Sequence, residues 1–324
     1  MAKVLITARL FGTVSDKGKQ LLLSAGHQIL PNPYLGRLLN EEEVIELIKD
    51  AEGIIAGQDA LTGKAIAAGK DLKIITRYGV GVDKVDIAGA TKQKVIVTNT
   101  PGANSDSVAE YAIALMLAVA RKLVIGRNSV FQGNWDFMTS TGLKNKVLGI
   151  IGLGKIGQGL ALRAKGFGMK IIACDPYPDN QFAEENEIGI VDLQQILSES
   201  DFVSLHAPGT KENIHLIGKK QLNLMKPTAI LINTARGTLI DEEALFNALI
   251  EKRIAGVGLD VLYNEPPGNN PLFTLENAVI TPHLAANTTD AIENMDLMSV
   301  QAVLAYFKGE RPPYMLNPEV YDEC

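Results

Sequence analysis

The sequence of 324 residues is poor in cysteine and in long hydrophobic runs. Cys174 and Cys324 are too few for a disulfide framework or a thiolate zinc site, which favours a reducing compartment. The longest apolar run, residues 111–120, is well short of the ~20 residues that a membrane span needs. The N-terminal residues also lack the layout of a secretory signal peptide. We therefore expect a cytoplasmic protein that does not associate with membranes.

An excess of positive charge is absent as well. Lys and Arg total 31 against 37 Asp and Glu, which gives a net charge of −6. Such a chain has no overall electrostatic footprint for nucleic acid, so we expect no nucleic-acid partner. The 4 histidines show neither the HExxH spacing nor a cluster with other ligands, so we expect no metal site.

The sequence is rich in short β-branched runs that alternate with longer amphipathic segments. This alternation is typical of βαβ units and predicts an α/β fold with mainly parallel sheets. The length is enough for two domains, each with its own core. Long helices are expected at residues 104–122 and 287–308. The predicted strands are residues 3–8, 27–30, 53–56, 72–76, 95–99, 147–151, 170–174, 202–205, 228–233, 256–260 and 279–281.

A glycine-rich loop, Gly152-Leu153-Gly154-Lys155-Ile156-Gly157, follows one of these strands and precedes a helical segment. Its glycines suit a tight turn, close approach to a pyrophosphate, and close packing of helix on strand. Asp175 ends the next strand 175 − 157 = 18 residues later, near the spacing of the acid that binds the adenosine ribose. Residues 176–179 contain no Arg or Lys for a 2′-phosphate. The pattern predicts a dinucleotide site that prefers NAD to NADP.

Three charged residues follow three successive predicted strands. Arg236, Glu265 and His283 therefore lie at the carboxyl edge of a sheet, where ligands bind in open α/β folds. His283 suits general acid–base catalysis, Glu265 could orient and charge its ring, and Arg236 could bind a carboxylate. Each residue alone has an ordinary interpretation: a surface arginine, a turn glutamate, a loop histidine. Together with a nicotinamide site they indicate a 2-hydroxyacid dehydrogenase.

The sequence resembles the D-isomer-specific 2-hydroxyacid dehydrogenase family over nearly its whole length. The matching stretches, in the order of the family, are RYGVGVDKVDI from Arg77, VTNTPGANSDSVAE, LGIIGLGKIG, HAP at 206–208, ILINTARGTLIDEEAL, GVGLDVLYNEPP and ITPHLAANT. The nearest likeness within the family is to the phosphoglycerate dehydrogenase-like group.

The resemblance implies a role for each matching residue. It makes Arg236, Glu265 and His283 catalytic. It implies that Arg77, Tyr78, Gly79 and Val80 bind substrate together with Arg236 and His283. It adds further residues to the cofactor site beside the glycine loop and Asp175: His206, Pro208, Thr234, Ala235, Arg236, Asp260 and His283.

The resemblance also implies the domain organisation. We expect a flavodoxin-like substrate domain formed by residues 1–99 and 287–324, with a Rossmann NAD-binding domain of residues 100–286 inserted in it. It further implies a homodimer held through residues 104–122. The expected substrate is a small anionic 2-keto or 2-hydroxy acid.

Two other functions remain open from the sequence. One is D-3-phosphoglycerate dehydrogenase; against it, Asp59 stands near the position where those enzymes typically carry a phosphate-binding Arg, and would repel a phosphate. Only about 16 residues follow the last predicted helix, which leaves no room for the regulatory domain common in that group. Glu265 argues against a formate dehydrogenase, which usually has Gln there. The other alternative is an NAD(H)-sensing, corepressor-like scaffold.

Overall fold

The computed structural model describes residues 1–34 and 36–322. The chain divides into two compact units: unit 1 consists of Met1–Asn104 and Asn287–Cys324, and unit 2 of Ser105–Ala286. The sequence predicts the first domain boundary between residues 99 and 100, whereas unit 1 ends at Asn104 in the structure. No helix within the described part of the chain combines the length and the apolar character needed to cross a membrane.

Unit 1 is built on a five-stranded sheet in the order β2-β1-β3-β4-β5, with every neighbouring pair parallel. This is the flavodoxin-like order. Its elements are β1 (Lys3–Ile6), α1 (Lys17–Ser24), β2 (Gln28–Ile29), α2 (Glu41–Ile48), β3 (Gly53–Ala56), α3 (Gly63–Ala68), β4 (Ile74–Arg77), α4 (Ile87–Lys92), β5 (Ile96–Thr98), α12 (Thr289–Phe307) and α13 (Glu319–Asp322).

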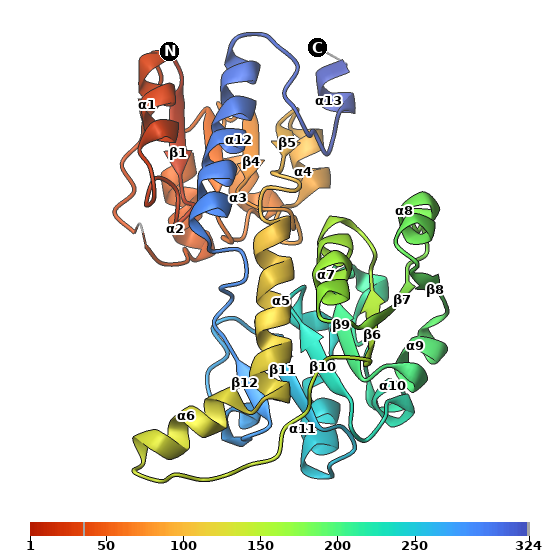
Figure 1. Ribbon diagram of the computed structural model, residues 1–324. Coiled ribbons are helices and arrows are strands. Elements are labelled where there is room, and N and C mark those ends of the chain that lie inside the picture. Colours follow the sequence, from red (N-terminus) through yellow and green to blue (C-terminus); the bar gives the residue numbers. More distant parts are fainter. Residues whose placement is uncertain (35, 323–324) are drawn as a thin grey trace. The chain divides into compact units, whose positions relative to one another are not determined.

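Helices cover both faces of this sheet, which is why its strands are apolar without alternation. β3 and β4 are buried throughout. One core includes α2, α3 and one set of strand side chains, and a second includes α1 and α12 with the other set. Figure 1 shows α12, in blue, beside α1. The end of the chain thus completes a unit that its beginning starts.

Unit 2 is built on a seven-stranded sheet in the order β12-β11-β10-β9-β6-β7-β8, again with every neighbouring pair parallel. This is the dinucleotide-binding order, which reverses between β6 and β9. Its elements are α5 (Ser105–Ala120), α6 (Leu123–Phe131), β6 (Val147–Ile151), α7 (Lys155–Gly166), β7 (Lys170–Cys174), α8 (Asn180–Glu185), β8 (Gly189–Ile190), α9 (Leu193–Glu199), β9 (Phe202–Leu205), α10 (Lys219–Leu224), β10 (Ile230–Asn233), α11 (Glu242–Ile250), β11 (Gly256–Leu259), β12 (Ala278–Ile280) and the 3₁₀ turns Lys211–Asn213, Gly237–Leu239 and Pro271–Thr274.

Helix α5 packs closely on the strands of unit 2. A Cβ at Gly256 would lie 2.8 Å from Val119, and one at Gly258 would lie 3.0 Å from Leu115. These glycines let the helix approach β11, the strand that precedes Glu265.

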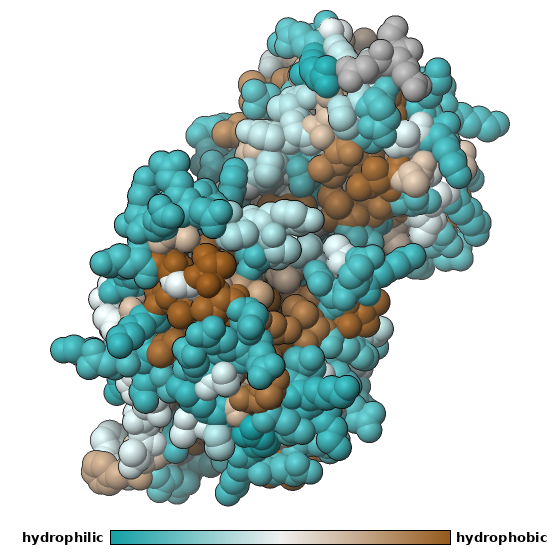
Figure 2. All heavy atoms as spheres, turned by 90° about the vertical axis from the view of Figure 1, so that its right-hand side faces the viewer, coloured by the Kyte–Doolittle hydropathy of each residue, from teal (hydrophilic) through white to brown (hydrophobic). Residues whose placement is uncertain are grey.

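The face shown in Figure 2 is largely hydrophilic, with apolar side chains gathered in separate patches.

The predicted fold class is confirmed: both units are α/β with parallel sheets. The sequence missed β8 and α6. The helix expected to end at Lys122 is interrupted there, because Lys122 has a left-handed φ of 52°, and a new helix starts at Leu123. Strand β8 is only two residues long and exposed, so it carries no apolar signal.

Candidate active site

The sequence-predicted residues of unit 2 lie on one edge of its sheet. In a parallel sheet all carboxyl ends meet at the same edge, so the loops that follow the strands are neighbours. The glycine loop follows β6, Asp175 follows β7, and His206 follows β9. The residues after the last three strands are Thr234, Ala235 and Arg236 after β10, Asp260 and Glu265 after β11, and His283 after β12.

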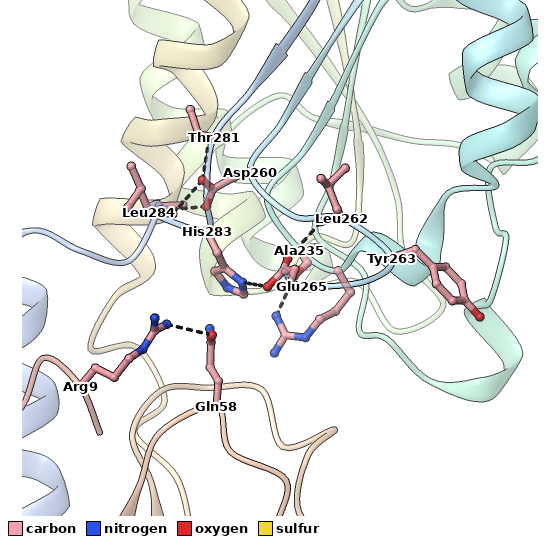
Figure 3. A network of polar contacts seen from close by, with 12 residues as sticks. Arg9, Gln58, Ala235, Asp260, Leu262, Tyr263, Glu265, Thr281, His283 and Leu284 are labelled. Carbon is pink, nitrogen blue, oxygen red and sulfur yellow. Dashed lines mark hydrogen bonds and ion pairs between the residues drawn. The ribbon is translucent and has the colours of Figure 1, made fainter. Parts of the chain in front are cut away.

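His283 and Glu265 form a close pair at this edge (Figure 3). His283 Nδ1 lies 2.7 Å from Glu265 Oε2, and both side chains are partly exposed, at 25% and 31%. Glu265 Oε1 accepts a hydrogen bond from the Leu262 amide at 3.0 Å. The carboxylate is therefore held from two sides, and it fixes the orientation of the imidazole ring.

Burial alone would raise the pKa of Glu265, but its neighbours reverse the effect. The hydrogen bond and charge of His283, the Leu262 amide and the charge of Arg236 together lower the pKa of Glu265 below 4.5. The carboxyl group is thus ionised at neutral pH. Because the folded pKa is lowered, the stability that this carboxylate contributes is present above its ordinary pKa and is lost as pH falls through the lowered value.

Asp260 anchors the loop that carries His283. Its carboxylate, 1% exposed as a residue, accepts from Thr281 Oγ1 at 2.7 Å and from the amides of Leu284 and Ala285, each at 2.8 Å. Its carbonyl accepts from the His283 amide at 2.9 Å. Burial raises the pKa of Asp260, and these hydrogen bonds oppose the rise. The resemblance places Asp260 in the cofactor site; in the structure its oxygens face this loop.

Arg236 is half-buried at the start of the 3₁₀ turn after β10. Its Nη1 donates to the Ala235 carbonyl at 2.7 Å, and its own carbonyl accepts from Asn233 Nδ2 at 2.8 Å. Thr234 is buried, and its Oγ1 has no hydrogen-bond partner in the described residues. The side chain of Asn233, at the end of β10, therefore holds the backbone of Arg236 in place.

The residues of the glycine loop fit a dinucleotide. Gly152 has φ 97°, and a Cβ there would lie 2.8 Å from the His206 carbonyl oxygen; one at Gly157 would lie 2.2 Å from the Gly152 oxygen. A Cβ at Gly154, by contrast, would meet nothing within 4 Å, so the loop is open on that side. Helix α7 begins at Lys155, and its first amides can hold phosphates.

Asp175 is tied to this loop. Its Oδ2 accepts from the Leu153 amide at 2.7 Å, and its Oδ1 accepts from the Tyr177 amide at 2.8 Å. The carboxylate is thus positioned beside the glycine loop, where the acid of a dinucleotide site belongs.

His206 is a neutral ring at neutral pH. Burial of the ring lowers the pKa of His206 to about 4. Its Nε2 lies 2.9 Å from Ser204 Oγ, and its buried Nδ1 has no partner in the described residues. The carbonyl of Pro208 accepts from Asn213 Nδ2 at 2.9 Å. A ring nitrogen without a protein partner, beside the glycine loop, fits a hydrogen bond to a bound cofactor.

The sequence-predicted substrate loop, Arg77–Val80, belongs to unit 1. The Tyr78 amide donates to the Ala56 carbonyl, and the Gly79 amide donates to Thr100 Oγ1 at 2.9 Å. The next amides, of Val80 and Gly81, have no acceptor in the described residues. These two, rather than those of Tyr78 and Gly79, are the donors that the loop offers to an anion.

Side chains hold this loop to α12. Tyr78 Oη donates to Asp296 Oδ1 at 2.7 Å and lies 3.1 Å from the Ile292 carbonyl oxygen. Burial and the neighbouring Asp296 raise the pKa of Tyr78. Arg77 is buried as well, and its Nη1 donates to the Tyr78 carbonyl. Asp296 was not predicted as a site residue, although an aspartate within an apolar helical pattern was a possible signal.

Asp59 is buried in its loop. It is 3% exposed, and its Oδ1 accepts from the Leu39 amide at 2.8 Å. The carboxylate is directed into unit 1 and does not present its charge at the surface. The Leu39 amide, which lies in a different loop, directs this side chain inward, and the repulsion of a phosphorylated substrate by Asp59 stays a prediction.

The described residues contain no group of three or more His, Cys, Asp or Glu side chains arranged to hold a metal ion.

Comparison with known proteins identifies the family. Residues 113–285, most of unit 2, match the model of the D-isomer specific 2-hydroxyacid dehydrogenase, NAD binding domain. A glyoxylate reductase of Thermococcus litoralis is 44% identical over 287 residues, which cover 86% of this chain and 87% of the relative. The chain belongs to the D-isomer-specific 2-hydroxyacid dehydrogenase family. It is an NAD-dependent oxidoreductase that acts on the CH–OH group of its donors.

Two further similar proteins are a longer relative with another substrate in its name and a solved crystal structure. A D-3-phosphoglycerate dehydrogenase of Methanocaldococcus jannaschii is 42% identical over 283 residues. The aligned residues cover 86% of this chain and 54% of that relative. The crystal structure of a glyoxylate reductase from Paecilomyes thermophila matches with a TM-score of 0.86 and 26% identity, covering 98% of this chain and 99% of that one. The fold thus extends over both units of the family member.

Proposed function

We propose that the protein is an NAD-dependent reductase of small 2-keto acids, which interconverts glyoxylate or a similar acid with the corresponding 2-hydroxy acid, of D configuration where the second carbon is chiral. The observation that carries this proposal is the 2.7 Å pair of His283 and Glu265, placed on the same sheet edge as Arg236 and the glycine loop. An acid–base pair, a carboxylate-binding cation and a nicotinamide site are the parts that this reaction needs.

Each residue then has a task in keto-acid reduction. Arg236 binds the substrate through its planar fork of donors, and the Val80 and Gly81 amides of unit 1 are further donors for a carboxylate. His283, oriented through Nδ1 by Glu265, gives a proton from Nε2 to the carbonyl oxygen as it becomes a hydroxyl. Bound NADH supplies the hydride. In the reverse direction His283 takes the proton back, and Glu265 stabilises the charged ring.

The substrate assay tests the proposal directly. NADH consumption would be followed with glyoxylate, hydroxypyruvate, pyruvate, phenylpyruvate and 3-phosphohydroxypyruvate. Multiple turnovers on at least one small acid are expected. NADH binding without turnover on any of them would contradict the proposal and would favour an NAD(H)-sensing scaffold.

D-3-phosphoglycerate dehydrogenase is the second candidate. Two observations favour keeping it: the 42% identity to an enzyme of that name, and the burial of Asp59, whose carboxylate accepts from the Leu39 amide and is directed into unit 1. A higher kcat/KM for 3-phosphohydroxypyruvate than for hydroxypyruvate would establish it. The reverse order would support the reductase of small, unphosphorylated acids.

Asp175 is proposed to select NADH over NADPH. A carboxylate accepts hydrogen bonds from ribose hydroxyls and repels a 2′-phosphate. Asp175→Ala is expected to raise the KM for NADH about tenfold or more, as the loss of a charged hydrogen bond does, and to narrow the preference over NADPH. Cofactor titrations with both nucleotides measure this. Glu184→Ala, an exposed carboxylate on α8, serves as the control, and an equal loss in both variants would remove the role from Asp175.

The Glu265 carboxylate is expected to set the pH range of keto-acid reduction. Reduction requires a protonated ring at His283, and an ionised Glu265 stabilises that form while a neutral amide does not. Glu265→Gln should therefore narrow the pH range of reduction at its alkaline end. Profiles of kcat/KM against pH would be compared with those of Glu276→Gln, an exposed carboxylate outside the site. An unchanged upper limit would show that the pair does not control the proton.

We also propose a cytoplasmic homodimer, in line with the family resemblance. The buried residues of α5 pack within unit 2, so the surface proposed for the contact is α6 and the segment after it. Phe131 and Phe137 are 75% and 95% exposed there, and Trp135, the single tryptophan, is 78% exposed. Figure 1 shows α6 extending away from the sheet of unit 2.

Phe137→Glu tests the proposed dimer contact. The charge is expected to weaken association at least tenfold, because burial of an ionised carboxylate without a partner is costly. Sedimentation velocity measures the association, and the fluorescence of Trp135 reports on the same surface. Ile250→Glu, 55% exposed on α11, is the matched control. A monomeric wild-type protein, or equal dissociation of both variants, would contradict the proposal.

A further inference from the structure

A carboxylate at the start of α11 is directed toward the loop that carries Glu265. Glu242 is the first residue of α11 and is partly buried, whereas the next carboxylate, Glu243, is exposed. The helix already has Asp241 as its N-cap, which accepts from the Ala244 amide at 3.1 Å. Capping of the helix therefore does not explain why Glu242 is turned inward.

Both carboxylate oxygens of Glu242 accept hydrogen bonds from this loop. Oε1 accepts from the Tyr263 amide at 2.6 Å, and Oε2 accepts from Asn270 Nδ2 at 2.8 Å. The side-chain oxygen of Asn270 in turn accepts from the Leu272 amide at 3.0 Å. Glu242 thus joins one residue before Glu265 to one residue after it.

Packing alone does not hold the segment between these two contacts. Leu262 and Leu272 are buried, at 8% and 0% exposed, but residues 263–266 between them are exposed. Figure 3 shows the side chain of Tyr263 pointing away from Glu265. The hydrogen bonds at its two ends therefore have a large part in placing this segment, and Glu265 within it.

The backbone that leads to Glu242 also contacts this loop directly. A Cβ at Gly237 would lie 1.9 Å from the Leu262 carbonyl carbon and 2.4 Å from the Tyr263 nitrogen, so only glycine allows the approach. The Leu262 amide is the donor that fixes Glu265 Oε1. The chain from Gly237 to Glu242 therefore supports the part of the loop on which the position of Glu265 depends.

The partners of Glu242 are both donors, so the position requires two acceptor oxygens. A glutamine offers one oxygen and one NH₂ group, and in either orientation one donor of the loop would face another donor. Turning the amide of Asn270 does not remove the conflict, because its oxygen already accepts from the Leu272 amide. The contacts therefore call for a carboxylate rather than for any polar side chain of the same size.

We infer that Glu242 is a positioning residue for keto-acid reduction, which holds the loop so that Glu265 meets His283 at 2.7 Å. The inference rests on the proposed function, in which this pair controls the proton. Glu242 acts through the Tyr263 amide and Asn270 rather than on a reacting atom. Because an acid–base pair works only within a narrow range of geometry, a loosened loop lowers the rate without removing either member.

Glu242→Gln tests the inference with little change in size. We expect kcat/KM to fall about 10- to 100-fold on the keto acid that the wild-type protein reduces best, with NADH affinity retained. The pH range of reduction should narrow at its alkaline end, as in Glu265→Gln. The charged residues that act on the pair, Arg236 and Asp260, are unchanged in this variant. Glu243→Gln, the exposed neighbour on the same helix, is the matched control and should behave as wild type.

Asn270→Asp provides a rescue that a general loss of stability would not show. Combined with Glu242→Gln, it exchanges amide and carboxylate: the amide at position 242 donates to the carboxylate at position 270, whose other oxygen still accepts from Leu272. The double variant is expected to recover kcat/KM to within about fivefold of wild type. Asn270→Asp alone sets two carboxylates against each other and should lose activity. No recovery in the double variant would overturn the inference.

A second comparison uses Glu265→Gln as the background. Because Glu242 is inferred to act through Glu265, adding Glu242→Gln there should narrow the pH range no further. Thermal unfolding of each variant measures the folded fraction. Further narrowing, or a loss in Glu242→Gln that only follows the loss of folded protein, would overturn the role of Glu242. Failure of the wild-type protein to reduce any of the acids would instead overturn the proposed function.

Discussion

Replacement of His283 should lower kcat by about 10²–10⁴-fold, because the reaction loses its general acid–base group. Binding of NADH should change little, since the glycine loop and Asp175 lie in other loops. Steady-state rates with glyoxylate and a fluorescence titration with NADH measure the two quantities separately. His283 has a left-handed φ of 56°, which asparagine tolerates better than most residues, so His283→Asn is the variant of choice beside His283→Ala.

The matched control for this prediction is already in the chain. His215 also lies in unit 2 with a φ of 54°, but it is exposed and outside the proposed site. His215→Asn is expected to keep full activity. If the His283 variants lost NADH affinity together with kcat, the residue would have a structural role and the proposed proton transfer would need another donor.

Arg236→Ala should lower kcat/KM by about 10²–10³-fold, mainly through a higher KM for the keto acid. The physical reason is the loss of a charged, two-pronged donor for the substrate carboxylate. Arg236→Lys keeps the charge but not the planar fork, so it should recover only part of the loss. Keto-acid saturation curves at fixed NADH measure the effect.

Arg253→Ala is the control for Arg236. Arg253 precedes β11, at the opposite edge of the same sheet, and donates to the Asn223 carbonyl. Its loss can lower stability but should leave the KM unchanged. An unaltered KM in Arg236→Ala would transfer carboxylate binding to other groups, of which the Val80 and Gly81 amides are the first to consider.

Much of the architecture could be predicted because it depends on local pattern. Runs such as residues 53–56 and 230–233 are apolar without alternation, and this marks strands covered on both faces. The spacing from the glycine loop to Asp175 reflects one βαβ unit, which is a local length. The order of Arg236, Glu265 and His283 along the chain matches β10, β11 and β12, so strand order alone places them at one edge.

Other features depend on contacts that no local pattern encodes. Asp59 looks like an exposed loop acid, yet the Leu39 amide from a different loop directs it inward. Tyr78 and Asp296 are bonded across a separation of 218 residues. Arg9 stands in a turn after β1, and only the pairing of β1 with β3 brings it to Gln58, whose Oε1 accepts from its Nη2 at 3.4 Å (Figure 3). In each case the deciding partner is distant in sequence.

The position of α12 has a consequence for how the chain folds during synthesis. Unit 2 is one continuous segment, and all of its strands have been made before the residues of α12 are. Unit 1, although its five strands come first, lacks Ile292, Met295 and Val303 of one core until that helix emerges. Until then α1 alone covers that face of the unit 1 sheet, and part of the face stays exposed, while the later-made unit 2 can already fold. Such an exposed face is where a chaperone would bind, so the nascent chain is most prone to aggregate between the two events.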